Sequence, residues 1–265
     1  MATRTARAPA MLESFVLHRY DWSESSLILD LFTREQGRVA VAAKGAKRPH
    51  SQLRAVLLPF QRLHVALARG RATGDDAAPP EVQTLRSAEW AGGAAMLTGA
   101  ALFAGFHCNE LLMKFIARQD PHPQLFDAYR ETLPVLGDAE DAAVQAALRA
   151  FELVLLRECG LLPDLACVTQ TQAPVAADAR FALLPEAGVA PARAGEAGVP
   201  GRVLVQLQAA LGHGSMAALR HACRPALPEL KAVLRGLVHY HLGTAALRTR
   251  RVMTDLQTLV QSPTR

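Results

Sequence analysis

Positively charged side chains are concentrated near the start of the chain. Residues 1–70 contain eleven Lys and Arg against five Asp and Glu, whereas residues 71–265 contain 18 against 19. The net charge of +5 therefore originates in the first 70 residues. Such segregation favours a polyanionic ligand, because cations that track a phosphate backbone release its condensed counterions. The candidate phosphate contacts are Arg34, Arg38, Lys44, Lys47, Arg48, Arg54 and Arg62.

The same part of the chain has the pattern of a small β structure. Residues that alternate in polarity and are bounded by turn formers predict strands at 15–20, 27–32, 38–43, 62–68 and 82–87. In the third, Val39, Val41 and Ala43 define a hydrophobic face, and Arg38 and Lys44 share the opposite one. Five short strands in under 90 residues predict a barrel compatible with an OB-fold, whose open face commonly takes single strands of nucleic acid.

Four rings are candidates for stacking on bases, an interaction of about 1–3 kcal/mol per base. Phe32 lies on the strand face of Asp30 rather than on the leucine face, which places it best to meet a ligand. His18, Tyr20 and Trp22 are the others. Core packing is the alternative for each ring.

Beyond residue 89 the hydrophobic period changes from two to about 3.6 residues. Helical patterns, broken at Pro121–Pro123, at Gly137 and at Gly160, cover about 90–120, 125–136, 139–159, 203–211, 215–223, 229–242 and 249–261. We interpret the uncharged run 90–109 as a core helix rather than a membrane span. The predicted fold class is α+β: an OB-fold barrel over 1–88, then a helical bundle over 89–265 that contains an irregular insertion at 163–202.

Two further sites follow from the helical part. A C-terminal basic cluster consists of Arg248, Arg250 and Arg251, with Lys231 and Arg235 preceding it. It predicts a second DNA contact, although basic residues at helix ends also simply complement the helix dipole.

The other site surrounds a charge within an apolar stripe. Arg149 lies between Leu148 and Phe151, an arrangement that can hold an acidic, aromatic-ended peptide. A structural ion pair is the alternative.

Enzymatic and metal sites are not favoured. The sequence has no phosphate-binding Gly-Lys-Ser/Thr loop, no Gly-x-Ser-x-Gly elbow and no His-Glu-x-x-His pair. Five possible metal ligands lie between residues 213 and 241, but His239 and His241 point about 200° apart on a helix. The four cysteines are scattered, as is typical of reduced thiols. We therefore expect no catalytic residue, no metal and no cofactor.

Short motifs in matching order resemble the RecO family of bacterial recombination mediators. They include Phe15-Val-Leu-His18-Arg19, Gly37-Arg38-Val39, Ala43-Lys44-Gly45-Ala46 and His241-Leu-Gly243. The resemblance implies an N-terminal OB-fold and a helical domain that together bind and anneal single- and double-stranded DNA. It also implies a cytoplasmic, nucleoid-associated protein that is not in the membrane.

The partners implied are the C-terminal tail of the single-strand-binding protein, a RecR-like mediator and, indirectly, the recombinase RecA. Many RecO proteins also carry two cysteine pairs that bind zinc after the third helix. Here Cys167-Val-Thr-Gln170 offers one thiol and no second pair follows, so 163–202 is expected to be a degenerate, zinc-free version. The competing hypothesis is a protein-interaction scaffold whose barrel binds an acidic peptide.

Overall fold

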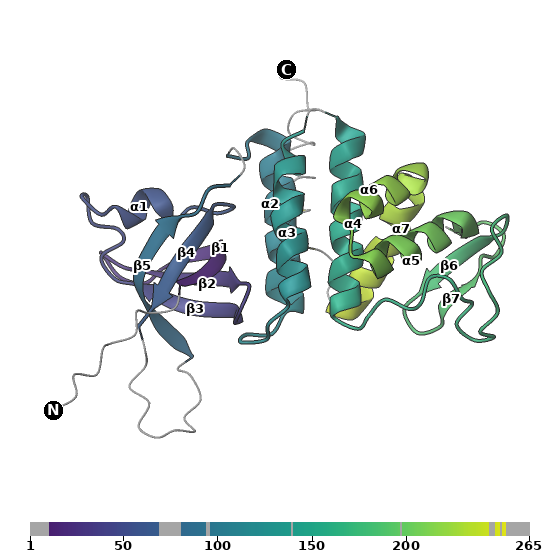
Figure 1. Cartoon of the computed structure of the whole chain (residues 1–265), viewed down its shortest axis with the longest axis horizontal. Coiled ribbons are helices and arrows are strands. Elements are labelled where there is room, and N and C mark those ends of the chain that lie inside the picture. Colours follow the sequence, from purple (N-terminus) through teal and green to yellow (C-terminus); the bar gives the residue numbers. More distant parts are fainter. Residues whose placement is uncertain are drawn as a thin grey trace, which may run out of the picture. The chain divides into compact units, whose positions relative to one another are not determined.

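The computed structural model describes residues 11–68, 81–93, 96–138, 140–196, 198–243, 247–249 and 251–252. The chain divides into two compact units (Figure 1). Of the described residues, those up to Met96 together with Ile116–Phe126 form the first unit. Leu97–Phe115 and the residues from Asp127 onward form the second.

The first unit is a closed five-stranded barrel. Its strands are β1 (Met11–Asp21), β2 (Leu27–Thr33), β3 (Gly37–Ala43), β4 (Arg62–Leu67) and β5 (Val82–Trp90), and a short helix, α1 (Leu53–Val56), precedes β4. The order around the barrel is β1-β2-β3-β5-β4, in which β3 and β5 are parallel and the other pairs antiparallel. The five predicted strands are therefore confirmed, and the barrel has the expected OB-fold character.

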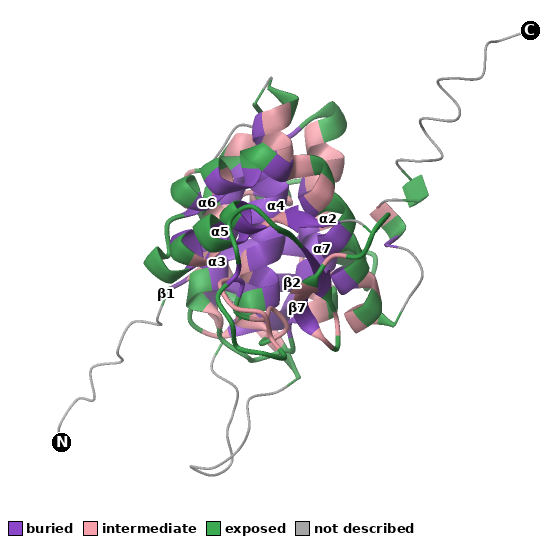
Figure 2. Ribbon diagram, turned by 90° about the vertical axis from the view of Figure 1, so that its right-hand side faces the viewer, coloured by how far each residue is buried: buried purple, intermediate pink, exposed green. Residues whose placement is uncertain are grey.

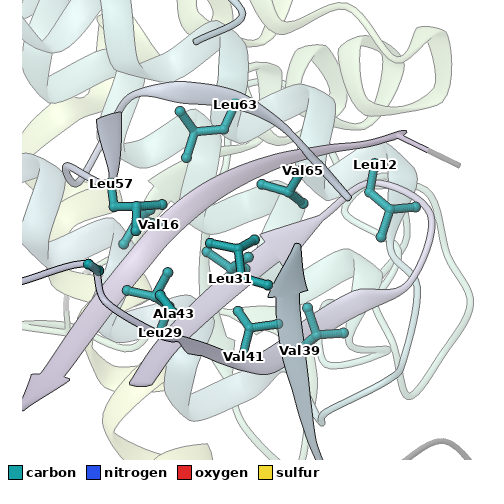
Figure 3. Packing of buried hydrophobic residues seen from close by; sticks show 12 residues of the cluster. Leu12, Val16, Leu29, Leu31, Val39, Val41, Ala43, Leu57, Leu63 and Val65 are labelled. Carbon is teal, nitrogen blue, oxygen red and sulfur yellow. The ribbon is translucent and has the colours of Figure 1, made fainter. Parts of the chain in front are cut away.

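Alternate residues of the strands fill the barrel. Leu29 and Leu31 of β2 and Val39 and Val41 of β3 are fully or almost fully buried, and Figure 3 shows their side chains converging in one cluster. Burying an aliphatic side chain of this size stabilises the fold by about 1.5–3 kcal/mol. The period-two pattern of the sequence thus identified the inner face correctly.

The outer face of β2 and β3 is covered as well. The backbone N–H of Gln119 donates to the Arg38 carbonyl at 2.8 Å. The Phe126 ring lies 5.3 Å from that of Phe15 and 5.4 Å from that of Phe32. The segment Ile116–Phe126 therefore packs along the barrel, and all seven residues of β3 are buried.

Six helices form most of the second unit: α2 (Gly99–Phe115), α3 (Pro123–Leu136, which begins in the first unit), α4 (Asp141–Glu158), α5 (Gly201–His213), α6 (Met216–Cys223) and α7 (Leu227–Leu242). Helix α4 contacts α2, α6 and α7, and most of its residues are buried (Figure 2). It ends where predicted, since Gly160 follows it with φ of 69°.

Two helical predictions need correction or fall outside the structure. The run 90–109 is not one helix, because β5 continues to Trp90 and α2 begins at Gly99. Most of the predicted helix 249–261 lies outside the described residues. Among the helices of the described residues, none has the length and apolarity that crossing a membrane requires.

The segment 163–202, expected to be irregular, is ordered in part. This segment contains a three-stranded antiparallel sheet, ordered β7-β6-β8 and made by β6 (Arg180–Leu184), β7 (Gly188–Pro191) and β8 (Val199–Pro200). Phe181 and Val189 are buried in it. The strands are only two to five residues long, so each is too short for a sustained period to be recognised.

Candidate nucleic-acid interface

The loop from β1 to β2 and the loop after β3 are fastened together. Lys47 Nζ donates to the Ser23 carbonyl at 3.1 Å and lies 3.0 Å from an Asp21 carboxylate oxygen. Its backbone N–H donates to the Ser25 carbonyl at 3.0 Å. Lys47 therefore joins the two loops, and part of its charge is compensated by Asp21.

Exposed rings line the end of β1 beside this junction. Tyr20 is 46% exposed and Trp22 is 57% exposed. The His18 and Tyr20 rings meet edge to face, with their centroids 4.4 Å apart. Large rings are normally buried where packing allows, so a group of exposed ones is a candidate contact surface for a ligand. Aromatic side chains of this kind can stack on unpaired bases.

Unpaired cations lie on the neighbouring loop and on α1. Lys44, Arg48 and Arg54 are exposed, and within the described part of the chain none of them has a salt bridge or a side-chain hydrogen bond. Because β2 and β3 pair antiparallel from Leu27↔Ala43, Lys44 follows β3 at the same end of the ladder as the β1–β2 loop. Lys44 and Arg48 of the predicted set, together with Lys47, therefore lie on the loop that is fastened to the β1–β2 loop beside Tyr20 and Trp22, and Arg54 follows on α1. We call Tyr20, Trp22, Lys44, Lys47, Arg48 and Arg54 the loop surface.

The structure corrects the expectation for Arg38. Its guanidinium makes two bonds to the Asp30 carboxylate, Nη2 to Oδ2 at 2.6 Å and Nε to Oδ1 at 3.2 Å. Nη1 donates to the Ile116 carbonyl at 2.7 Å. The Arg38 side chain is 10% exposed and that of Asp30 3%, so this charge is not offered to a phosphate. A signal was available, because Asp30 is an opposite charge on the same face of the neighbouring strand.

Phe32 requires the same correction. Its side chain does lie on the outer face, as the alternation predicts, but it is fully buried against Phe126. A base cannot stack there unless the covering segment leaves the barrel. The β2–β3 face commonly used by OB-folds is therefore occupied by the chain itself.

Arg34 and Arg62 are not part of the loop surface. Arg34 lies in the β2–β3 turn, at the other end of the β2–β3 ladder from Lys44, and is half-buried. Arg62 donates from Nε and Nη2 to the Ala91 carbonyl, at 3.0 and 2.6 Å, and lies 3.5 Å from Glu13. These contacts make Arg62 a tie between β4 and the end of β5.

Arg149 forms a structural ion pair, which was the alternative to a peptide-binding role. Its Nη2 lies 2.7 Å from Oε1 of Glu152, three residues along α4, and both side chains are less than a tenth exposed. Leu148 and Phe151 are also buried. Burial opposes ionisation of Glu152, but the Arg149 charge and a hydrogen bond with His107 hold its pKa below the usual value. We therefore withdraw Arg149, Leu148 and Phe151 as a surface that binds a peptide.

The C-terminal basic cluster is partly visible. Arg248 and Arg251 are exposed, as are Lys231 and Arg235 on α7, whereas Arg250 lies outside the described side chains. Arg248 and Arg251 are held near α2 by a contact that sequence reasoning missed. Glu110, a buried carboxylate of α2, accepts the backbone N–H groups of Arg248 and Thr249.

Comparison with known proteins identifies the relatives of this fold. Residues 11–75 match the family model "Recombination protein O N terminal", and residues 96–251 match "Recombination protein O C terminal". The chain belongs to the RecO family. It is 51% identical to the DNA repair protein RecO of Polaromonas sp. strain JS666, over 93% of this chain and 96% of the relative. The corresponding protein of Verminephrobacter eiseniae is 50% identical over 97% and 99%, and that of Variovorax paradoxus 49% over 97% and 99%.

The zinc site of some RecO proteins does not fit these residues. Cys167 is half-buried, Gln170 is exposed, and the turn between β6 and β7 carries no thiol or imidazole. Thr169 instead connects this segment to β7, because its Oγ1 accepts from the Val189 N–H at 2.9 Å. Gly188 packs against Thr169 so closely that an added Cβ would lie 2.2 Å from Oγ1. Hydrogen bonds and packing thus hold this segment to β7.

Proposed function

We propose that the chain is a non-enzymatic DNA-binding mediator of recombinational repair that gathers and anneals DNA strands on the loop surface. The observation that carries this proposal is that exposed Tyr20 and Trp22 lie beside the loop of Lys44 and Arg48, two exposed cations that have no salt bridge among the described residues. The names of the relatives support a role in DNA repair. We expect the protein to act in the cytoplasm, at the nucleoid.

The mechanism follows from the two kinds of side chain. The cations neutralise phosphates, which lowers the repulsion between two strands and releases counterions. The rings hold unpaired bases by stacking, which tolerates any sequence because every base has a π face. Neither step requires nucleotide hydrolysis. Annealing follows because the second strand meets bases that are already unpaired and a backbone whose charge is partly neutralised.

The proposal also includes protein partners. We propose that the chain works with the single-strand-binding protein and its C-terminal tail, with a RecR-like mediator and, indirectly, with RecA. The buried pairing of Arg149 with Glu152 means that the tail is not assigned to that part of α4. A soluble tail peptide titrated against isotope-labelled protein would locate its surface.

The test compares annealing of complementary single strands by the native chain and by Lys44→Gln/Arg48→Gln. A control, Arg193→Gln/Arg202→Gln, removes two exposed charges from the second unit. If the two loop cations each contact a phosphate, the slope of log affinity against log salt for single strands becomes about 1.4 shallower. Annealing then falls in the loop variant and not in the control.

The rings are tested separately. Tyr20→Ala/Trp22→Ala loses about 1–3 kcal/mol for each base no longer stacked, whereas the salt slope stays unchanged. Tyr240→Ala, which removes a tyrosine 51% exposed on α7, is the matched control. Native protein that binds an acidic peptide at the loop surface but anneals no strands would overturn the mediator proposal and favour the interaction scaffold.

A further inference from the structure

One cation of the loop surface is bound to an anion of the chain itself. Lys47 Nζ lies 3.0 Å from Oδ1 of Asp21 and donates to the Ser23 carbonyl at 3.1 Å. Among the described residues, Lys44 and Arg48 of the same loop have no such partner. A carboxylate oxygen resembles a phosphate oxygen in its charge and in accepting a hydrogen bond from an ammonium group. Asp21 therefore occupies Lys47 in the way that a phosphate of a bound strand would.

The Asp21–Lys47 pair lies at the surface and is easily separated. The Asp21 side chain is 80% exposed and that of Lys47 33%. Such pairs contribute little net stability, because water and salt solvate both charges when they part. The pair of Arg38 and Asp30 is the opposite case, since its side chains are 10% and 3% exposed and separation would leave a buried charge unpaired. Lys47 can thus exchange its anion, whereas Arg38 cannot.

The loop keeps its position when the Lys47 side chain moves. The Lys47 backbone N–H donates to the Ser25 carbonyl at 3.0 Å, and the Arg48 N–H donates to the Gly45 carbonyl at 3.1 Å. Ala46, the residue before Lys47, is fully buried in the barrel core. None of these contacts involves the Lys47 ammonium group. The ion pair is therefore a removable contact on a loop that is fixed by other means.

We propose that Asp21 is an autoinhibitory residue of the loop surface, which holds Lys47 in the free protein until a phosphate of a bound single strand replaces it. This proposal rests on the proposed function and adds a means of regulating the same site. Asp21 weakens strand binding, because binding must break the pair and brings a carboxylate near phosphates. As a strand leaves, Asp21 recaptures Lys47 without the help of a second molecule. A protein that anneals strands must also release the duplex, and Asp21 promotes that step.

The first experiment compares two single substitutions in the β1–β2 loop. Asp21→Asn removes the competing charge, and the matched control Glu24→Gln removes a charge that has no ion pair among the described residues. Affinity for a labelled oligothymidylate should rise more in Asp21→Asn than in the control, by a factor of up to about five, which corresponds to the strength of an exposed ion pair. Dissociation of the strand should slow to match. Equal changes in both variants would show that only net charge matters, and weaker binding by Asp21→Asn would show a purely structural role; either result overturns the proposal.

The second experiment asks whether the gain in affinity depends on Lys47. Lys47→Gln should make the slope of log affinity against log salt for single strands about 0.7 shallower, because one phosphate contact is lost. In the Lys47→Gln background, Asp21→Asn should have no more effect than Glu24→Gln. An unchanged slope would mean that Lys47 stays with Asp21 in the complex and that no exchange occurs. Thermal melting checks that the variants are folded, and Asp21→Asn, which changes an exposed side chain, remains decisive if Lys47→Gln is not.

A failure of the exchange is distinguishable from a failure of the proposed function. Lys44→Gln/Arg48→Gln measures whether the loop surface holds strands at all. If that variant loses annealing while Asp21→Asn behaves like Glu24→Gln, the loop surface stands and the autoinhibitory role of Asp21 is wrong. If Lys44→Gln/Arg48→Gln anneals strands at the native rate, the proposed function fails and the role of Asp21 fails with it.

Discussion

Replacing Arg38 distinguishes the buried ion pair from a surface phosphate contact. In Arg38→Ala the Asp30 carboxylate stays buried without its cation, and the Ile116 carbonyl loses a donor. Breaking a buried pair in this way costs about 3–5 kcal/mol. With a urea dependence of about 2 kcal/mol per molar, typical of small proteins, the unfolding midpoint falls by about 2 M.

Tryptophan fluorescence reports this transition specifically, because both tryptophans of the chain, Trp22 and Trp90, belong to the barrel unit. Asp30→Leu/Arg38→Met replaces the pair by apolar side chains and should recover most of the lost stability. In native conditions the salt slope for single strands should not change in the double variant. A loss below about 1 kcal/mol in Arg38→Ala, together with a slope shallower by about 0.7, would show that Arg38 contacts phosphate and that our assignment is wrong.

Three other predictions follow from buried contacts. Phe126→Ala should destabilise the barrel by about 3–5 kcal/mol, measured by the same fluorescence, because its fully buried ring packs on the outer face. The lowered pKa of Glu152 means that its ionised form stabilises the fold above the unfolded pKa of about 4.5. This stabilisation is lost as the pH falls through the lower pKa of the folded state. Glu152→Gln should therefore show a flatter dependence of stability on pH below pH 4.5. Thr169→Val should lower stability by about 1–3 kcal/mol because the buried Val189 N–H loses its acceptor. Because we expect no zinc in this segment, a chelator should leave the melting temperature of the native protein unchanged.

Local residue patterns were sufficient to predict the barrel strands and most of the helices. Alternation over two residues placed Leu29 and Val41 inside the barrel, and the helix that ends before Gly160 was predicted from its period and its terminal glycine. The loop surface was partly predictable too. Lys44 and Arg48 follow a strand whose end the sequence marks, so their exposure required no knowledge of distant residues.

Short strands and distant contacts were not predictable in the same way. The sheet at 180–200 has strands too short to show a period. The clamp between Glu110 and Thr249 joins positions 139 residues apart, and nothing in either neighbourhood indicates the other. The clustering of basic residues in the sequence therefore identified the C-terminal cations but not the α2 residue that binds their backbone.

The sequence by itself determined which face of each barrel strand is apolar, where most helices end and how charge is divided along the chain. These properties depend on residues within a few positions of one another. Only the tertiary structure decided whether the second face of a strand is open. Phe32 and Arg38 lie on the predicted face, but the segment Ile116–Phe126 covers it and turns both into interior residues. Alternation specifies the direction of a side chain, whereas its exposure depends on which distant segment packs against it.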